Sequence, residues 1–343
     1  MAQDGADFGL QYERVRELGS GAFGTAQLMR DRGTGELVAV KYIPLRYVDH
    51  RTERELLNHR KLSVGGHPNV VQFKKAFVTS THLAIAMEYA SGGDLFTYAI
   101  EARGRLDEDT ARFYFQQLIG GLAYCHSRVV SHRDIKLENT LLEDRSARPA
   151  AKICDFGYSK DGILNSTPDT VCGTSAYMAP EVLAGGEYNG RPVDVWACGV
   201  ALFVMLVGDL PFVDPANRNS NQRMIARINA VQYHFPRGLQ LSEGCVNLIR
   251  RIFVFDPQER ISLQAVQQDP WFLTNLLPGF FQNGGMPGQL GQPAQSEEEL
   301  VAVVLLAQQA YQAQLAQLAQ LNGDLMMDDH LLDDGADLEF VVE

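Results

Sequence analysis

The sequence predicts an α+β fold with two lobes, a small one of antiparallel β-strands followed by a large α-helical one. Residues 12–43 read as strands paired around a turn at Gly33–Gly35, and residues 70–89 return to apolar, strand-like runs. After Gly92–Gly93 the apolar residues recur with helical spacing. A chain of 343 residues is long enough to give each lobe its own core.

The helices predicted for the two lobes differ in character. Residues 52–62 (TERELLNHRKL) are mostly good helix formers and give the small lobe one short helix. In the large lobe, residues 110–127 are amphipathic, whereas residues 193–208 are apolar on nearly every side. The longest apolar run, Val195–Gly208, has 14 residues, which is too short to span a bilayer and is typical of a buried helix.

A linker rich in glycine and proline separates the two lobes from a C-terminal helix. Ser296 and Glu299 form a capping-box pattern at the start of that helix. Apolar residues then recur three and four positions apart, which predicts an amphipathic helix with one buried stripe: Leu300, Val304, Ala307, Tyr311, Leu315 and Leu318. A coiled-coil dimer seam is the alternative, although the repeat covers only about three heptads and lacks charged flanking positions.

The predicted divisions of the chain follow from these patterns. They are an N-terminal extension at 1–11, a two-lobed domain at 12–272 (small lobe 12–87, hinge 88–93, large lobe 94–272), a linker at 273–295, an amphipathic helix at 296–322 and an acidic tail at 323–343.

Composition and charge narrow the class of protein. The chain is 45% hydrophobic and 21% charged, as expected of a folded soluble protein. Its net charge of −12 is localised, because no Lys or Arg follows Arg260. Residues 1–260 hold 30 basic and 30 acidic residues, since the other 12 of the 42 acidic residues lie beyond them. A neutral body with an acidic tail argues against direct nucleic-acid binding and makes the tail a candidate for binding a partner.

The N-terminus and the cysteines predict an intracellular protein. The first ten residues contain neither the basic nor the apolar region of a signal peptide. The five cysteines are scattered and never form a C-x-x-C pair, which argues against a disulfide framework or a zinc site and suits a reducing compartment. We therefore expect no association with a membrane.

The first chemical motif is glycine-rich. Gly19–Gly24 (GSGAFG) matches G-x-G-x-x-G, which alone is weak evidence, because a dinucleotide-binding fold needs a helix to start there. Here a second strand follows, as in a glycine-rich hairpin that covers the phosphates of ATP. The next strand, Val38–Lys41, carries one lysine among apolar residues, and Glu55 lies on the following helix. We interpret Lys41 and Glu55 as a buried ion pair.

Three further motifs follow in order. His132–Asn139 reads HRDIKLEN, Asp155–Gly157 reads DFG, and Ala179–Glu181 reads APE. These are the catalytic-loop, metal-binding and activation-segment-closing motifs of protein kinases. With the glycine-rich loop and the strand lysine they make five motifs at family-like spacing. Residues 12–272 therefore resemble a eukaryotic protein kinase, which implies the two-lobed kinase fold and phosphoryl transfer from ATP with Mg²⁺.

The resemblance implies a role for each site residue. Asp134 would accept the proton of the substrate hydroxyl, Lys136 would neutralise charge on the transferred group, and Asn139 and Asp155 would hold Mg²⁺. Lys41, held by Glu55, would grip the phosphates, with Met87 as gatekeeper and Glu88–Ala90 supplying the hinge hydrogen bonds. The complete ATP-binding set is Leu18, Gly19, Ser20, Gly21, Ala22, Phe23, Gly24, Thr25, Ala26, Ala39, Lys41, Glu55, Met87, Glu88 and Ala90. Glu181 would pair with Arg260, and Asp194 would brace the catalytic loop.

Regulation and substrate class follow from neighbouring residues. Arg133 beside the catalytic aspartate predicts activation by phosphorylation at Thr170, with Ser166 second, and Arg133 and Lys160 would receive the phosphate. Lys136 and Thr174 are typical of Ser/Thr kinases rather than Tyr kinases. Asp94 and Glu138 correspond to the acids that hold an arginine three residues before the target. The alternative for these two residues is that they are solvated surface acids.

Several stretches point to one subfamily: ELVAVKYI, THLAIAMEYASGGDLF, ARFYFQQLIGGLAYCH, HRDIKLENTLL, KICDFGYSK and FVMLVGDLPF. They closely resemble plant sucrose non-fermenting-related kinases of subfamily 2, the osmotic-stress and abscisic-acid kinases. QSEEELVAVVLLAQQA is similar to the family's C-terminal box helix, which packs on the helix that carries Glu55. Two features depart from the family: Thr170–Val171 stands where Ser–Thr is frequent, and residues 307–320 are rich in Gln and Ala.

The resemblance also implies partners. It implies protein substrates such as transcription factors, channels or other stress effectors, an upstream activating kinase, a type 2C protein phosphatase docking on the acidic tail, a monomeric state, and a cytoplasmic and nuclear location. A catalytically idle scaffold is the competing hypothesis, but it would be expected to lack Lys41, Asp134 or Asp155, and all three are present. Kinases of the AMP-activated and calcium/calmodulin types are nearer rivals. No ubiquitin-associated-like domain, basic calmodulin helix or EF-hand is recognisable in the sequence to support them.

Overall fold

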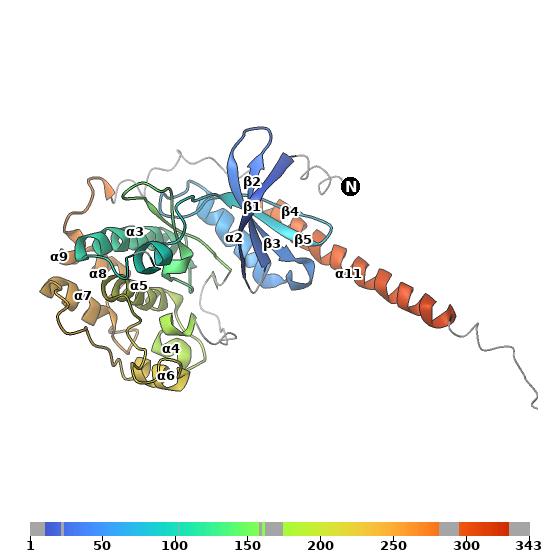
Figure 1. Ribbon diagram of the computed structural model, residues 1–343. Helices are drawn as coiled ribbons and strands as arrows, with labels where there is room; N and C mark the ends of the chain where they lie inside the picture. Colours follow the sequence, from blue (N-terminus) through green and yellow to red (C-terminus); the bar gives the residue numbers. More distant parts are fainter. Residues whose placement is uncertain are drawn as a thin grey trace, which may run out of the picture.

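The structure, a computed structural model, consists of two lobes with a long C-terminal helix that extends away from them (Figure 1). It describes residues 11–21, 24–101, 103–157, 160–161, 174–280 and 295–328. A five-stranded antiparallel sheet forms the small lobe, and the large lobe is mainly helical. The predicted fold class is therefore confirmed.

The elements follow one another along the chain as β1 (Tyr12–Gly21), β2 (Gly24–Asp31), β3 (Leu37–Pro44), η1 (Leu45–Tyr47), α2 (His50–Ser63), β4 (Phe73–Val78), β5 (His82–Glu88), η2 (Thr97–Glu101), α3 (Glu108–Ser127), β6 (Val130–Ser131), η3 (Leu137–Asn139), β7 (Thr140–Leu142), β8 (Ala151–Ile153), β9 (Lys160–Asp161), η4 (Thr174–Tyr177), α4 (Pro180–Leu183), α5 (Gly190–Val207), α6 (Asn221–Asn229), α7 (Glu243–Ile252), α8 (Leu263–Gln267), α9 (Pro270–Leu273) and α11 (Glu297–Asp328).

The sheet of the small lobe has the strand order β1-β2-β3-β5-β4. Because side chains alternate across a strand, Val38 and Val40 are buried on one face of β3, while Ala39 and Lys41 are partly exposed on the other. Ala39 pairs with Met87 of β5 across the ladder. The antiparallel register thus places the strand lysine and the predicted gatekeeper on the same face of the sheet.

Helix α2 begins at a well-formed cap. The Asp49 carboxylate accepts hydrogen bonds from the backbone amides of Arg51 and Thr52, which satisfies two donors of the first turn. The helix buries Glu55, Leu56 and His59 on the side that faces the sheet and the active site. It is two residues longer at its N-terminus than the sequence predicted, because Asp49 rather than a later residue provides the cap.

The large lobe is built around α3 and the apolar helix α5. Trp196 of α5 is fully buried, and its ring stacks on Phe212. Among the residues that the structure describes, α5 is the one helix long and apolar enough to cross a membrane, and most of it lies inside the lobe. The helix ends at Gly208, whose φ of 82° is left-handed and suits glycine. The sequence prediction of a buried core helix is confirmed.

A buried ion pair connects α4 to the rest of the large lobe. Both carboxylate oxygens of Glu181 bind the Arg260 guanidinium, at 2.7 and 2.9 Å. The Arg260 side chain is fully buried and also lies over the ring of Trp196. The two planar groups therefore meet in the bidentate geometry that makes such pairs strong.

We expect Glu181→Ala to lower the free energy of unfolding by about 3–5 kcal/mol, because it leaves a buried guanidinium without its counter-charge. Urea denaturation followed by tryptophan fluorescence can measure this, since both tryptophans, Trp196 and Trp271, lie in the large lobe. Glu187→Ala, at an exposed position of the same segment, is the control. A change below about 1 kcal/mol in Glu181→Ala would show that the pair adds no more than an exposed one.

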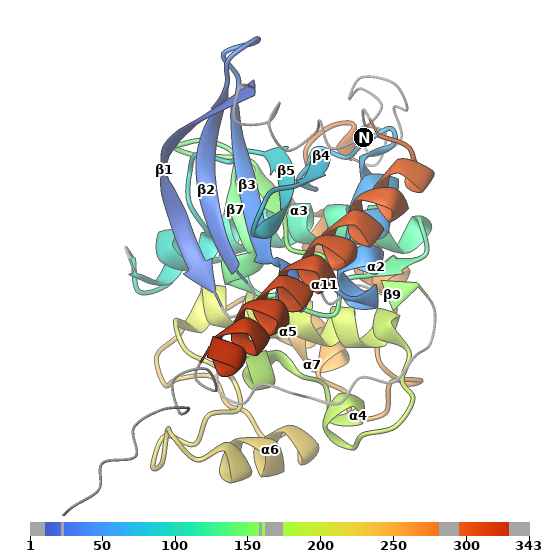
Figure 2. The same cartoon turned by 90° about the vertical axis from the view of Figure 1, so that its right-hand side faces the viewer.

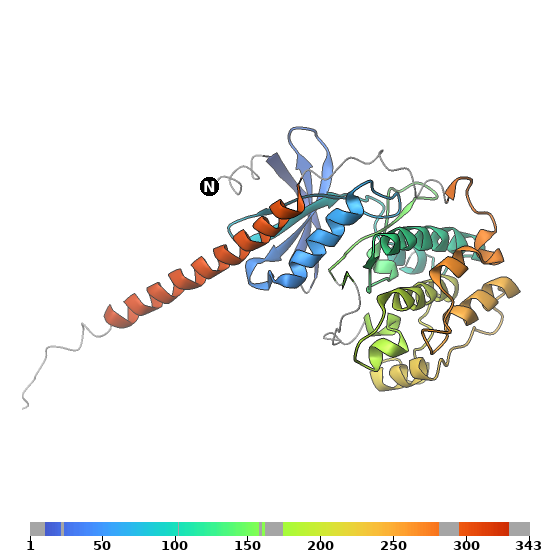
Figure 3. The same cartoon turned by 180° about the vertical axis from the view of Figure 1, so that it is seen from behind.

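Helix α11 starts with the predicted capping box. The Ser296 amide donates to the Glu299 carboxylate at 2.7 Å, and the Glu299 amide donates to the Ser296 hydroxyl at 3.2 Å. The helix then runs beside α2 and over the edge of the sheet, in contact with α2, η1, β4 and β5 (Figures 2 and 3). Leu300, Val304 and Ala307 are buried there in the core of the small lobe.

Two predictions about α11 are wrong. The buried stripe does not continue, because Leu315 and Leu318 are 42% and 57% exposed where the helix passes beyond the lobe. The helix also ends at Asp328 rather than at residue 322. A single Gly323 costs a helix only about 1 kcal/mol, and the helix formers that follow it allow the helix to continue.

Candidate active site

The centre of the site is a lysine shared by two carboxylates. Lys41 Nζ lies 2.7 Å from Glu55 of α2 and 3.2 Å from Asp155, which follows β8. A Cβ at Gly157 would lie only 3.3 Å from the Glu55 carboxylate, so glycine allows α2 to approach this segment closely. Three elements distant in sequence thus converge on one ammonium group.

Lys41 and the two carboxylates shift one another's pKa values: burial and the Asp155 charge raise the pKa of Glu55, although the Lys41 charge lowers it. Burial alone would lower the pKa of Lys41, but Glu55 and Asp155 raise it above its ordinary value. The Lys41 charge lowers the pKa of Asp155 to about 2, against the opposing effect of burial. Asp155 is therefore an anion and Lys41 a cation at physiological pH, which is the state that binds phosphate oxygens and a hard metal ion.

The catalytic loop presents a second carboxylate. Asp134 Oδ2 accepts hydrogen bonds from Lys136 Nζ at 2.8 Å and from Asn139 Nδ2 at 2.7 Å. Oδ1 of the same carboxylate is buried and has no hydrogen-bond partner in the described part of the chain. Because a buried polar atom without a partner is costly, Oδ1 is the atom expected to accept a substrate proton.

The backbone is strained in both segments that carry the active-site aspartates, the one before Asp134 and the one at Asp155. Arg133 and Asp155 have φ values of 68° and 64°, which are uncommon for residues other than glycine. The fully buried Asp194 holds the first of these segments, since its carboxylate accepts the backbone amides of His132 at 2.9 Å and Arg133 at 2.7 Å. The structure places Asp194 under the catalytic loop, where the sequence analysis expected it.

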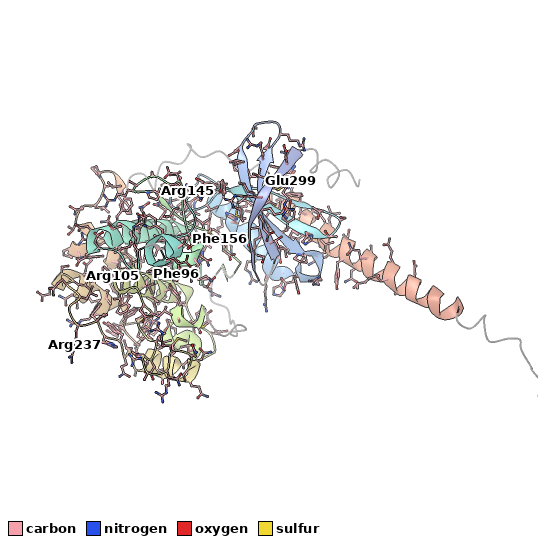
Figure 4. All side chains as sticks on the ribbon, viewed as in Figure 1. Phe96, Arg105, Arg145, Phe156, Arg237 and Glu299 are labelled. Atoms are coloured by element: carbon pink, nitrogen blue, oxygen red, sulfur yellow. The ribbon has the colours of Figure 1, made fainter. Side chains whose placement is uncertain are left out.

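A column of rings connects the lobes, and sequence reasoning missed half of it. His59 of α2 lies 5.8 Å from Phe73 and 5.0 Å from Phe156 between ring centroids, and Phe156 lies 5.1 Å from His132. Figure 4 shows Phe156 between the lobes. Burial lowers the pKa of His59 to about 4, so it is neutral and bonds the Val71 carbonyl. One signal was present in the sequence: His59 follows Glu55 by one helical turn.

The predicted ATP-binding residues lie on the strands of the sheet and at the hinge: Ala26, Ala39 and Met87 share the face of Lys41, whereas Thr25 pairs with Tyr42 on the other face. Leu18, Thr25, Ala26, Ala39 and Met87 are all partly exposed on their strands. Gly24 has a φ of 147°, and a Cβ there would lie 1.9 Å from the Tyr42 carbonyl oxygen, so this position requires glycine. Gly19 and Ser20 are exposed in β1, and Gly21 ends that strand. Ala22 and Phe23 lie outside the described residues.

A lysine behind the hinge was not predicted. Lys152 Nζ lies 2.9 Å from the Glu88 carboxylate and 3.0 Å from the Pro68 carbonyl oxygen. The backbone amide of Glu88 donates to the Gln72 carbonyl. Ala90 is buried two residues further on. The side chain and the amide of Glu88 are thus fixed by neighbouring elements at the start of the hinge.

The two acids predicted to hold a substrate arginine lie near each other. Burial, together with the charges of Asp94 and Asp134, raises the pKa of Glu138, while Lys136 lowers it. Asp94 also accepts the backbone amide and the hydroxyl of Thr97, so it caps the turn at η2 as well. A cation beside this pair would relieve the repulsion between the two acids.

The predicted regulatory residues are only partly described. Thr170 and Ser166 lie outside the described residues, and of Lys160 only the backbone is placed, paired with Ser131. Burial lowers the pKa of Arg133, and the nearby Arg54 lowers it further, although Tyr188 and Asp194 oppose this. Burial and the nearby charge of Asp155 raise the pKa of the Cys154 thiol.

The donor set fits a magnesium nucleotide. The Asp155 side chain is 40% exposed, so its anionic carboxylate is open to a ligand. Asn139 adds a side-chain amide, whose nitrogen donates to the Asp134 carboxylate. Oxygen ligands of this kind suit Mg²⁺, which retains waters and phosphate oxygens in its coordination sphere. Together with Lys41, these residues can bind ATP phosphates between the lobes.

Comparison with known proteins places the chain in a family. A model of the protein kinase domain matches residues 12–272. The chain is 49% identical over 325 residues to serine/threonine-protein kinase SRK2E of Arabidopsis thaliana, covering 94% of this chain and 88% of that protein. It is 47% identical over 329 residues to serine/threonine-protein kinase SAPK9 of rice, with 95% and 90% covered.

A moss relative agrees with these two. The chain is 54% identical over 267 residues to serine/threonine-protein kinase SRK2A of Physcomitrium patens, with 78% of this chain and 75% of that protein covered. Identity at this level over most of both chains establishes kinship, and the motifs at Lys41, Asp134 and Asp155 lie within the matched domain. The chain therefore belongs to the protein kinases and, within them, to the plant sucrose non-fermenting-related kinases of subfamily 2, and it is a Ser/Thr protein kinase.

Proposed function

We propose that the protein transfers the γ-phosphate of Mg-ATP to serine or threonine in proteins that carry an arginine three residues before the target, as part of osmotic-stress or abscisic-acid signalling. The observation that supports the transfer chemistry most directly is Asp134 Oδ1, which is buried and has no hydrogen-bond partner among the described residues, together with the Lys41–Glu55–Asp155 group. Asn139 and Asp155 would hold the magnesium that accompanies ATP, and this ion would supply charge neutralisation for the phosphates.

The chain's own residues supply positioning. Asp134 Oδ1 orients the substrate hydroxyl and accepts its proton as the oxygen attacks. Lys136 Nζ donates a hydrogen bond to Oδ2 of the Asp134 carboxylate. From this position its ammonium group can reach the transferred phosphoryl group. Lys41 holds the α- and β-phosphates, and Glu55 keeps its ammonium in place. Phosphoryl transfer depends mainly on such positioning and on electrostatic stabilisation.

The C-terminal helix supports the active arrangement in this proposal. Leu300, Val304 and Ala307 share a core with Leu56, which is next to Glu55 on α2. A helix docked there opposes movement of α2 away from Lys41. The kinase would then hold its ion pair without a separate activating subunit, and phosphorylation of Thr170 would order the activation segment around Arg133.

Partners would control the activity through the activation segment and the acidic tail. An upstream kinase would phosphorylate Thr170, and a type 2C phosphatase docking on the acidic tail would reverse it, in the cytoplasm and the nucleus. Residues 324–343 hold eight acidic and no basic residues, which supports a role in binding a partner with a basic surface. Thr170→Ala and Ser166→Ala, compared as separate variants, test which site the upstream kinase uses. Full activation of Thr170→Ala would exclude Thr170 as the activating site.

Glu138→Gln tests the substrate preference and the reaction together. Wild type should phosphorylate Arg-x-x-Ser and Arg-x-x-Thr peptides but not the tyrosine counterpart, and should lose about ten-fold in kcat/KM when that arginine becomes alanine. The variant should lose most of this discrimination, because one of two carboxylates facing the guanidinium is gone. Glu243→Gln, on the exposed surface of α7, is the control. Equal rates of wild type on arginine and alanine peptides would defeat the arginine preference.

A further inference from the structure

Strand β4 lies at the edge of the small-lobe sheet, and the backbone of one of its residues is hydrogen-bonded by a side chain that does not belong to the sheet. Ala76 is 1% exposed, so its backbone amide and carbonyl need partners within the protein. The carboxamide of Gln295 supplies both: Oε1 accepts the Ala76 amide at 2.7 Å, and Nε2 donates to the Ala76 carbonyl at 2.9 Å. A side-chain amide has the same donor and acceptor as a peptide, so Gln295 takes the place of one residue of a neighbouring strand.

The backbone of Gln295 is held as well. Its carbonyl oxygen accepts Arg60 Nε of α2 at 2.6 Å, and Arg60 Nη1 lies 3.3 Å from Glu297 in the first turn of α11. The N-cap of α11, Ser296, is the next residue. Residue 295 therefore fixes the point at which α11 begins, relative to both β4 and α2.

The position of that starting point determines which side chains α11 buries. Leu300 and Val304 follow at one and two helical turns and lie against Leu56. A shift of one residue along the chain would rotate α11 by about 100° and turn this stripe away from α2. Arg60 is five residues beyond Glu55 on the same helix, so the contact also restrains the far end of α2.

We propose that Gln295 is a positioning residue of this kinase: by pairing with the free edge of β4 it sets the register of α11 on α2 and so keeps Glu55 within reach of Lys41. This inference rests on the proposed role of Lys41 and Glu55 in phosphoryl transfer. Leu300 and Val304 pack α11 on α2, and the hydrogen bonds of Gln295 determine where along α11 this packing occurs.

Two substitutions of the same residue test this proposal in the full chain, phosphorylated to equal extent. Gln295→Ala removes both hydrogen bonds, and kcat/KM for ATP should fall about five- to fifty-fold, the range that two buried hydrogen bonds allow. Gln295→Glu keeps the acceptor but loses the donor while ionised. Its deficit should be at least as large as that of Gln295→Ala from pH 6 to 8, because an ionised carboxylate cannot donate to the Ala76 carbonyl and repels it.

Amide hydrogen exchange provides a readout that does not depend on activity. The Ala76 amide and the amides of α2 should exchange faster in Gln295→Ala than in wild type. Gln314→Ala is the control, since its carboxamide donates one hydrogen bond to the Ser80 carbonyl at 2.6 Å, 19 residues further along the chain. Wild-type kcat/KM and wild-type exchange in Gln295→Ala would overturn the proposal, as would full activity of Gln295→Glu in this pH range. If wild type transferred no phosphate, the proposed function would fail, and the exchange data would still decide whether Gln295 sets the position of α2.

Discussion

Replacing Lys41 with methionine should lower kcat/KM for ATP by about 10²–10³-fold, because it removes a preorganised cation from the phosphate-binding group. The loss should exceed that expected from one missing contact. Without the ammonium, the carboxylates of Glu55 and Asp155 face each other with no cation between them. The pKa of Asp155, now held at about 2 by the Lys41 charge, should rise.

Steady-state kinetics with varied ATP, recorded from pH 5 to 8, measure this effect. In wild type Asp155 stays ionised across the range, because its lowered pKa lies far below it. Lys74→Met is a matched control, since Lys74 of β4 forms a surface ion pair with Glu36, which precedes β3. A loss no greater in Lys41→Met than in Lys74→Met would show that the Lys41 group is structural only.

Replacing Leu300 with aspartate should reduce activity although residue 300 touches no catalytic group. Leu300 is fully buried among the side chains of α2, β4 and η1. An ionised carboxylate cannot remain there without a partner, so α11 should leave the lobe. With its outer face uncovered, α2 should sample positions in which Glu55 no longer meets Lys41. A population shift of this kind should lower kcat/KM by about ten- to hundred-fold.

The same helix offers a control for this substitution. Leu318→Asp places an identical charge on α11 at a site that is 57% exposed. It should leave activity unchanged. Thermal unfolding should show that the large lobe keeps its stability in both variants, because the described part of α11 packs mainly on α2, η1, β4 and β5 of the small lobe. If Leu300→Asp remained as active as Leu318→Asp, the packing of α11 on α2 would not support the active arrangement.

Much of the site could be predicted from sequence because its parts are local. The glycine-rich loop, the lysine two residues after Ala39 and the HRDIKLEN run each carry their chemistry in a few consecutive residues. The order of these motifs then determines which of them can meet across the two lobes. The alternation of β3 was enough to place Lys41 on the same face as Ala39.

Contacts that depend on long-range packing were not predictable. His59 and Phe73 lie on different elements, and only the tertiary fold shows that a neutral histidine contacts the rings of two phenylalanines. Gln295 stands in a linker whose composition predicts no specific contact. The stripe on α11 was overextended for a related reason: helical spacing shows which residues share a face but not where the neighbouring lobe ends.

The central claim is that Asp134 accepts the substrate proton in phosphoryl transfer. Transfer of labelled γ-phosphate from Mg-ATP to an Arg-x-x-Ser peptide, compared between wild type and Asp134→Asn, tests it most directly. Asparagine preserves the shape of the side chain and can still bond Lys136 and Asn139, so folding and ATP binding should persist. We predict that kcat falls by about 10²–10⁴-fold while KM for ATP changes by less than about three-fold. Equal kcat values in the two proteins, or no transfer by phosphorylated wild type, would contradict the account.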